Sequence, residues 1–209
     1  MDIVLFGASG MLGSRILNEL LSRGHHVTAM VRTPTELPPH ANLTETAGDI
    51  FHSAEVADAA EGAAVVVSAY GPGPANPALL PEAMRSLIAG VEKAGVKRLV
   101  AVGGAGSLEV APGMQLLDTP DFPPDWKGIA IAHRDALDLL KASSLDWTSI
   151  CPAAFIHPGE RTGKFRLGKD QLVIDGKGKS EISAEDFAIA VADEVEVPKQ
   201  VRQRFTVAW

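Results

Sequence analysis

Three glycines at three-residue intervals form the segment of this chain best suited to binding a ligand. Gly7-Ala8-Ser9-Gly10-Met11-Leu12-Gly13 directly follows the apolar run Ile3-Val4-Leu5-Phe6. Between a strand and a helix, such glycines allow a tight turn, a close approach of the backbone to a diphosphate, and packing of the helix on the sheet. The unpaired N–H groups and the positive end of the helix dipole then face the anion. The pattern predicts a dinucleotide site whose contacts come from Gly7, Ala8, Ser9, Gly10, Met11 and Leu12. The alternative is a tight turn without a ligand.

The residue that follows the second apolar run indicates which cofactor would fit. Val27 to Val31 is followed by Arg32, at a position where an NAD site usually has Asp or Glu to bind the ribose hydroxyls. A carboxylate there would repel a 2′-phosphate, whereas a guanidinium can bind it through two hydrogen bonds. The sequence therefore favours NADP(H) over NAD(H), and Arg15, in the first turn of the helix, could assist. The alternative is that Arg32 is a solvated strand end.

Short apolar runs alternate with helical stretches along the chain, which is typical of a parallel sheet. This predicts an α/β protein of the Rossmann type, a doubly wound parallel sheet with helices on both faces and a small C-terminal substrate-side lobe. The length fits a single domain, residues 1–209. The expected strands are residues 3–6, 27–31, 43–46, 64–69, 98–102, 147–151, 172–174 and 204–208. Helices are expected at 77–94 and 125–142, and a last helix should begin with a capping box at Ser183 and Asp186.

Two long irregular stretches, residues 103–124 and 152–180, each follow a strand. In an open α/β sheet, the segments that follow the carboxyl ends of the strands line the ligand crevice. We therefore expect both stretches on the substrate side of the site, with surface decoration as the alternative.

Composition narrows the possible partners. The net charge of −7 and the pI of about 5.3 argue against a nucleic-acid or anionic-membrane partner. No apolar run approaches the roughly 18–20 residues that span a bilayer. The single cysteine, Cys151, cannot form an intramolecular disulfide, which favours a reducing compartment and hence the cytoplasm. The lone thiol and the lack of a His-Glu-x-x-His motif make a metal site an unfavoured interpretation.

Several further motifs accompany the glycine segment. They are Ala29-Met30-Val31-Arg32, Gly48-Asp49-Ile50, Ser68-Ala69-Tyr70-Gly71, Val102-Gly103-Gly104-Ala105-Gly106-Ser107-Leu108, Asp146-Trp147-Thr148 with Pro152, and Pro158-Gly159-Glu160-Arg161-Thr162-Gly163. With these motifs, nearly the whole chain resembles the atypical short-chain dehydrogenase/reductase group. Within that group it is most similar to the NADH-flavin reductase branch, which is related to biliverdin reductase B/flavin reductase and to NmrA-like proteins.

The resemblance implies a role for each matching position. Asp49 and Ile50 would lie beside the adenine. Ser68, Ala69 and Tyr70 would follow the ribose and diphosphate. Gly103 and Gly104 would pass under the nicotinamide, and Pro152, Ala153 and Phe155 would cover it.

One departure from the larger group concerns catalysis. Ordinary members use a Tyr-x-x-x-Lys pair to protonate a carbonyl, but the only tyrosine here is Tyr70, and the two positions fall on Ile129 and His133. The polar groups left near the nicotinamide are the candidate catalytic residues Ser107, His133 and His157, while Arg161 and Lys164 could attract an anion or lie in solvent. For His133 a hydrogen-bonded core histidine is an equal alternative.

Such a site favours an acceptor that needs no protein acid. An isoalloxazine accepts hydride and stabilises the product anion itself. We therefore expect NADPH-dependent hydride transfer to a planar small molecule, such as FMN, another flavin or a quinone. A non-catalytic NADP(H) redox sensor of the NmrA-like type, with a protein partner, is the alternative, and an epimerase or dehydratase ranks third.

Overall fold

Eight strands form the central sheet of the computed structural model, which describes residues 1–34 and 37–209. The sheet order is β10-β12-β8-β5-β4-β1-β2-β3. Seven of these strands run parallel, and β10 at the edge pairs antiparallel with β12. Their bounds are β1 Asp2–Phe6, β2 His26–Val31, β3 Leu43–Ala47, β4 Val65–Ser68, β5 Arg98–Val102, β8 Asp146–Cys151, β10 Arg166–Gly168 and β12 Gln203–Ala208.

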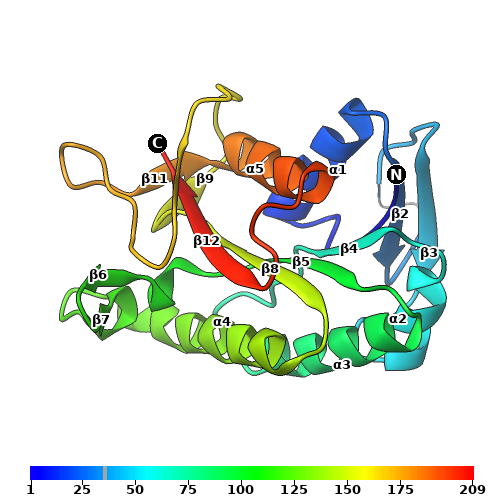
Figure 1. The fold of residues 1–209 in the computed structure, drawn as a ribbon, viewed down its shortest axis with the longest axis horizontal. Helices are drawn as coiled ribbons and strands as arrows, with labels where there is room; N and C mark the ends of the chain where they lie inside the picture. The colour runs from blue at the N-terminus through cyan, green and yellow to red at the C-terminus, as the bar shows by residue number, and fades with distance from the viewer. Residues whose placement is uncertain (35–36) are drawn as a thin grey trace.

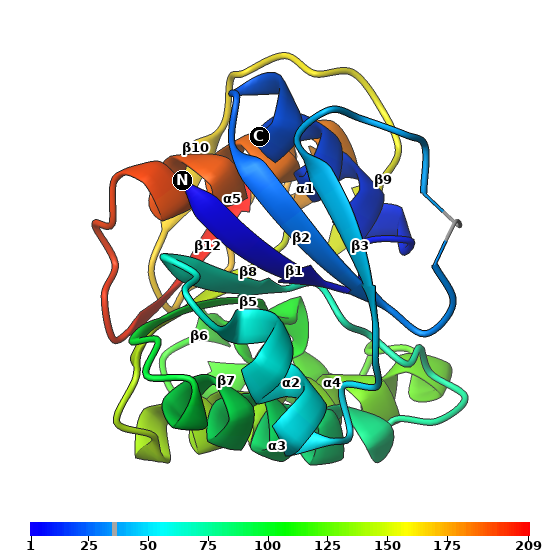
Figure 2. The same ribbon diagram turned by 90° about the vertical axis from the view of Figure 1, so that its right-hand side faces the viewer.

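Helices cover both faces of this sheet, so the doubly wound fold expected from the sequence is confirmed. α1 (Met11–Ser22) and α5 (Ala184–Glu196) lie together on one face, and α2 (Ser53–Ala60), α3 (Leu79–Lys93) and α4 (Pro124–Ala142) lie on the other (Figures 1 and 2). Among the described residues, no helix combines the length and apolar character needed to cross a bilayer.

The alternation of side chains along β1 divides the core into two layers. Ile3 and Leu5 belong to the cluster beneath α1 and α5, whereas Val4 and Phe6 belong to the cluster above α2, α3 and α4. All four side chains are at most 3% exposed. Burying an apolar side chain of this size contributes about 1.5–3 kcal/mol, so β1 stabilises both layers at once.

Short elements fill the two irregular stretches. The first contains η1 (Ala105–Ser107), η2 (Leu116–Asp118) and a hairpin of β6 (Glu109–Ala111) with β7 (Met114–Gln115). In the second, β9 (Phe155–His157) pairs in parallel with β11 (Glu181–Ser183), which leads into α5.

The predicted strand at 172–174 is wrong. The backbone N–H of Leu172 donates to the carbonyl of Glu109 at 2.9 Å, and Glu109 forms an isolated bridge with Gln171. This segment therefore docks onto the first irregular stretch, and β10 takes the edge of the main sheet instead. The two irregular stretches, separated in sequence, are thus joined to each other.

Candidate nucleotide-binding site

The strand order reverses between β1 and β4, where open α/β sheets bind ligands. The carboxyl ends of these two strands are joined by the N–H of Ala69, which donates to the carbonyl of Phe6 at 2.9 Å. A Cβ placed on Gly7 would lie 2.7 Å from the backbone of Ala69 and 2.8 Å from the nitrogen of Tyr70. Glycine at position 7 therefore lets the two strand ends meet.

The turn from β1 into α1 needs glycine at two positions for steric reasons. Gly7 has φ +80°, a left-handed conformation that side chains disfavour. A Cβ on Gly13 would lie 1.9 Å from the carbonyl oxygen of Gly7, so the first turn of α1 packs directly on the preceding turn. Gly10 tightens the turn further, because its N–H donates to the same oxygen at 3.1 Å.

The amino end of α1 is suited to an anion. Its N-cap residue is Gly10, no side chain caps the helix, and its first turn carries no carboxylate. The early N–H groups of a helix lack intrahelical partners, and the helix dipole is positive at that end. Ser9, Gly10 and Met11 are exposed there. A diphosphate would find donors and no competing acid.

Arg32 and Asp49 lie close enough to Tyr70 to affect the pKa of its hydroxyl group. Burial raises the pKa of Tyr70, Arg32 lowers it, and Asp49 raises it further. Arg32 is exposed immediately after β2, while Asp49 is half-buried and its carboxylate accepts from the N–H of Phe51 at 3.0 Å. The Tyr70 ring meets Phe51 edge-on, with centroids 5.9 Å apart. Beside them, Ile50 packs on the core, and Ser68 is buried at the end of β4.

Arg15 does not join this group. Its Nε donates to Glu185 of α5 at 3.1 Å, and its Nη1 donates to the carbonyl of Met11 at 3.2 Å. The second contact to a 2′-phosphate therefore stays a prediction, and in the conformation described the Arg15 guanidinium is paired with a carboxylate on another helix.

The loop after β5 lies against α4 and β8. The N–H of Gly103 donates to the carbonyl of Ile150 at 2.8 Å. A Cβ on Gly103 would lie 2.7 Å from Ser149 Oγ, and a Cβ on Gly104 would lie 2.8 Å from Cγ of His133. The imidazole of His133 thus packs directly against Gly104. Burial lowers the pKa of His133 to about 4, so this ring is neutral at physiological pH.

After β8 the chain passes from core to surface. Pro152 and Ala153 are buried, whereas Phe155 is 60% exposed. His157 lies beside Phe155, with ring centroids 5.1 Å apart. Its Nδ1 lies 2.9 Å from the carbonyl of Pro158, and its Nε2 lies 2.9 Å from Glu181. Both partners are acceptors, and they raise the pKa of His157.

Ser107 and Arg161 are occupied by protein partners. The buried hydroxyl of Ser107 accepts from Nη1 of Arg204 at 2.9 Å. Arg161 donates to both carboxylate oxygens of the buried Glu19 on α1, at 2.9 and 2.8 Å, and these bonds lower the pKa of Glu19. Arg161 therefore lies at the surface, with a side chain 58% exposed, but its charge is paired with Glu19, while Lys164 is exposed.

Sequence reasoning missed the role of Asp186. Ser183 does cap α5 by accepting from the N–H of Asp186 at 3.0 Å. The fully buried Asp186 carboxylate accepts from the N–H and hydroxyl of Thr162, from the N–H of Gly163 and from Nε1 of Trp209. A capping-box pattern cannot show these contacts, because the donors lie more than 20 residues away in the chain. Asp186 fixes the segment around Thr162 on the amino end of α5.

A parallel sheet with a glycine turn at its switch point defines a Rossmann nucleotide-binding protein. A family model described as NAD(P)H-binding matches residues 7–198. The chain belongs to this family, within the atypical short-chain dehydrogenases/reductases that the motifs indicated.

Three solved structures are similar over the whole chain. A "putative exported protein" from Burkholderia pseudomallei is 50% identical, with a TM-score of 0.91 and all of both chains covered. A "putative epimerase" from Bacteroides thetaiotaomicron is 41% identical, with a TM-score of 0.94 over 100% of this chain and 96% of that one. A "putative NADH-flavin reductase" from Streptococcus pneumoniae TIGR4 is 33% identical, with a TM-score of 0.88 over 100% and 99%. Their names differ, and each describes that protein alone.

Proposed function

We propose that this protein is an NADPH-dependent reductase that delivers hydride to a planar conjugated acceptor, such as a flavin or a quinone. Membership of an NAD(P)H-binding family and the name of the streptococcal relative support the reductase class. Bound NADPH would supply the hydride from its nicotinamide ring. The glycine turn, with its uncapped helix and missing Cβ atoms, fits the diphosphate of this cofactor.

Arg32 supports the choice of NADPH over NADH. It follows β2 and is exposed, and no hydrogen bond or ion pair holds its side chain within the described ranges 1–34 and 37–209. A 2′-phosphate beside the adenosine would therefore meet an available guanidinium. Asp49, Ile50, Ser68, Ala69 and Tyr70 would line the remainder of the nucleoside half.

The observation that carries the choice of acceptor is the contact between Gly104 and His133. Gly103 and Gly104 would form the floor under the nicotinamide, and the α4 side chain against that floor is a neutral imidazole. The only tyrosine, Tyr70, follows β4 instead. Without a tyrosine acid on α4, reduction is best suited to an acceptor whose own ring system stabilises the added electron pair, and that acceptor takes its proton from water.

The other polar candidates fit positioning better than proton transfer. Ser107 is held by Arg204, and both nitrogens of His157 face acceptors. Pro152 and Ala153 would close the site above the nicotinamide, and the exposed ring of Phe155 would face the acceptor.

The test is NADPH oxidation by the purified protein with FMN, riboflavin and a series of quinones. We expect turnover above the protein-free rate with NADPH, a lower rate with NADH, and a reduced rate for Arg32→Glu with NADPH only. Lack of turnover with every acceptor would refute the reductase proposal. If NADPH and NADP⁺ then bound with clearly different affinities, a redox sensor would be the better reading.

A further inference from the structure

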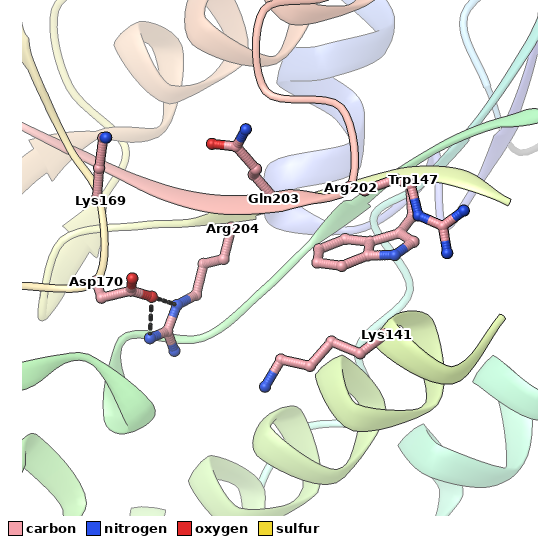
Figure 3. A pocket seen from close by; sticks show the side chains of 7 residues that line it. All are labelled: Lys141, Trp147, Lys169, Asp170, Arg202, Gln203 and Arg204. Carbon is pink, nitrogen blue, oxygen red and sulfur yellow. Dashed lines mark hydrogen bonds and ion pairs between the residues drawn. The ribbon is translucent and has the colours of Figure 1, made fainter. Parts of the chain in front are cut away.

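A cavity lies between the carboxyl end of α4 and strands β8 and β12, away from the glycine turn. Its volume is about 290 Å³, and Lys141, Trp147, Arg202 and Arg204 contribute to its lining. Figure 3 shows these four side chains on one side of β12, with Lys169 and Gln203 pointing to the other side. No residue of the glycine turn lines this cavity.

The polar groups on this side are almost entirely donors. Lys141, Arg202 and Arg204 carry positive charge, although the whole chain has a net charge of −7. The acidic side chain of the lining, Asp170, already accepts from Nε and Nη2 of Arg204, at 3.0 and 2.6 Å. Outside the cavity, Asp138 pairs with the half-exposed Lys141 at 3.0 Å. Such a set leaves an acceptor of negative charge as the best-matched occupant.

The indole of Trp147 forms part of the wall and carries a buried donor. The side chain is 5% exposed, and its Nε1 has no hydrogen-bond partner among the described residues. Buried donors of this kind are usually satisfied in folded proteins. Figure 3 shows the ring between the guanidinium of Arg202 and the side chain of Lys141.

Arg202 occupies an unusual backbone position. Its φ is +55°, and it is the one residue other than glycine with positive φ among those that the structure describes. Glycine or asparagine suits this conformation better, and other side chains hold it at a cost in free energy. Its N–H donates to the carbonyl of Trp147 at 2.6 Å, and its Nη2 donates to the carbonyl of Ser143 at 3.2 Å. The strained turn thereby brings a guanidinium to the cavity mouth.

Hydrogen bonds also fix the side chain of Arg204, which lines another part of the cavity. Its side chain is 12% exposed, and the carbonyl and hydroxyl of Ser107 accept from Nη1 while Asp170 accepts from the other nitrogens. Its guanidinium is therefore already ordered, so an anion beside it would bear little further ordering cost, although its charge is paired with that of Asp170.

We propose that this cavity binds a small multivalent oxyanion, inorganic phosphate or a phosphate monoester, between Lys141, Arg202 and Arg204. The site is separate from the proposed nucleotide site and does not depend on it. Lys141 and Arg204 already have the carboxylate partners Asp138 and Asp170, so the occupant would chiefly compensate the charge of Arg202 and lie against the indole of Trp147.

The three tryptophan indole N–H groups allow a site-specific test with inorganic phosphate as the probe. In a ¹⁵N–¹H correlation spectrum, the Trp147 signal is identified by its loss in Trp147→Phe, or by elimination from Trp126→Phe and Trp209→Phe. Phosphate is titrated at constant ionic strength, with chloride as the replaced anion, in the presence and absence of NADP⁺. Phosphate bound at the glycine turn would be displaced by NADP⁺ and would not account for a persistent Trp147 shift.

We expect a saturable shift of the Trp147 signal. In the double variant Lys141→Gln/Arg202→Asn the affinity should fall about tenfold or more, because two charged donors are lost. Asparagine accepts the left-handed backbone at position 202, so this variant should fold. Lys199→Gln, which removes an exposed charge outside the lining, should change the affinity less than about twofold. A Trp147 signal that does not saturate, or that titrates equally in the double variant, would overturn the proposal.

Discussion

Replacing Asp186 by asparagine should loosen the segment around Thr162 from the amino end of α5 and lower the stability of the fold. The asparagine oxygen can still accept from the N–H groups of Thr162 and Gly163, and the Thr162 hydroxyl can rotate to accept from the new NH₂ group. The indole N–H of Trp209 cannot rotate in this way, so it loses its acceptor next to another donor. A buried unsatisfied donor costs about 1–3 kcal/mol, and the remaining bonds lose their charge assistance. We expect a loss of about 2–4 kcal/mol in the free energy of unfolding.

Urea denaturation at pH 7, followed by circular dichroism, measures this loss. Asp58→Asn makes the same chemical change on an exposed face of α2 and should alter the free energy by less than about 0.5 kcal/mol. Trp209→Phe should reduce the free energy of unfolding less in the Asp186→Asn background than in the wild type, because the hydrogen bond from the indole to position 186 is already broken there. An Asp186→Asn protein within about 0.5 kcal/mol of wild type would refute the argument.

The Asp186 carboxylate should also make the stability of the protein depend on pH in the acid range. Burial raises the pKa of Asp186, but hydrogen bonds from Thr162, Trp209 and Gly163 outweigh burial and lower it. The folded pKa is thus below the unfolded value of about 3.9. The stabilisation by this group is therefore complete well above that value and is lost as the pH falls towards the folded pKa. Asp186→Asn should lose this component of acid sensitivity.

Three further expectations concern the candidate nucleotide site. Arg32→Glu should shift the ratio of NADPH to NADH affinity by about tenfold or more towards NADH in fluorescence titrations. An unchanged ratio would show that Arg32 does not bind the 2′-phosphate. Gly13→Ala should destabilise the fold by about 2–4 kcal/mol in urea, because its Cβ would meet the Gly7 carbonyl at 1.9 Å, whereas Gly71→Ala, with open space, should be nearly neutral. His133 has a folded pKa of about 4, below its unfolded value of about 6.5, so stability should fall as the pH drops through that window. His133→Gln should flatten this dependence, and identical profiles would contradict it.

The sequence was most informative where local chemistry decides structure. The glycine spacing predicted the turn at Gly7, and the structure adds the steric reason for Gly13. Ser183 was recognised as a helix cap because capping depends on residues three apart. The alternation of apolar runs and helical stripes predicted the doubly wound sheet, since those periodicities reflect burial on each face.

Contacts between distant segments could not be predicted in this way. Arg161 is exposed, as expected, but its ion pair with Glu19, which lies 142 residues earlier, could not be predicted. The residues at 172–174 have the composition of a strand, yet they do not extend the sheet, and Leu172 donates to the carbonyl of Glu109 instead. In both cases the partner, and not the local sequence, determined the outcome.

The packing of α5 and β12 determines when the core can be completed as the chain folds during synthesis on the ribosome. Phe187, Val191 and Phe205 belong to the same apolar cluster as Ile3 and Leu5, almost 200 residues earlier. A nascent chain that has emerged only as far as β8 therefore has all the helices of the α3 side, whereas the layer around β1 is covered only by α1. Because this layer stays incomplete until α5 is synthesised, nonsense mutations before position 184 should yield aggregation-prone fragments and not smaller stable domains.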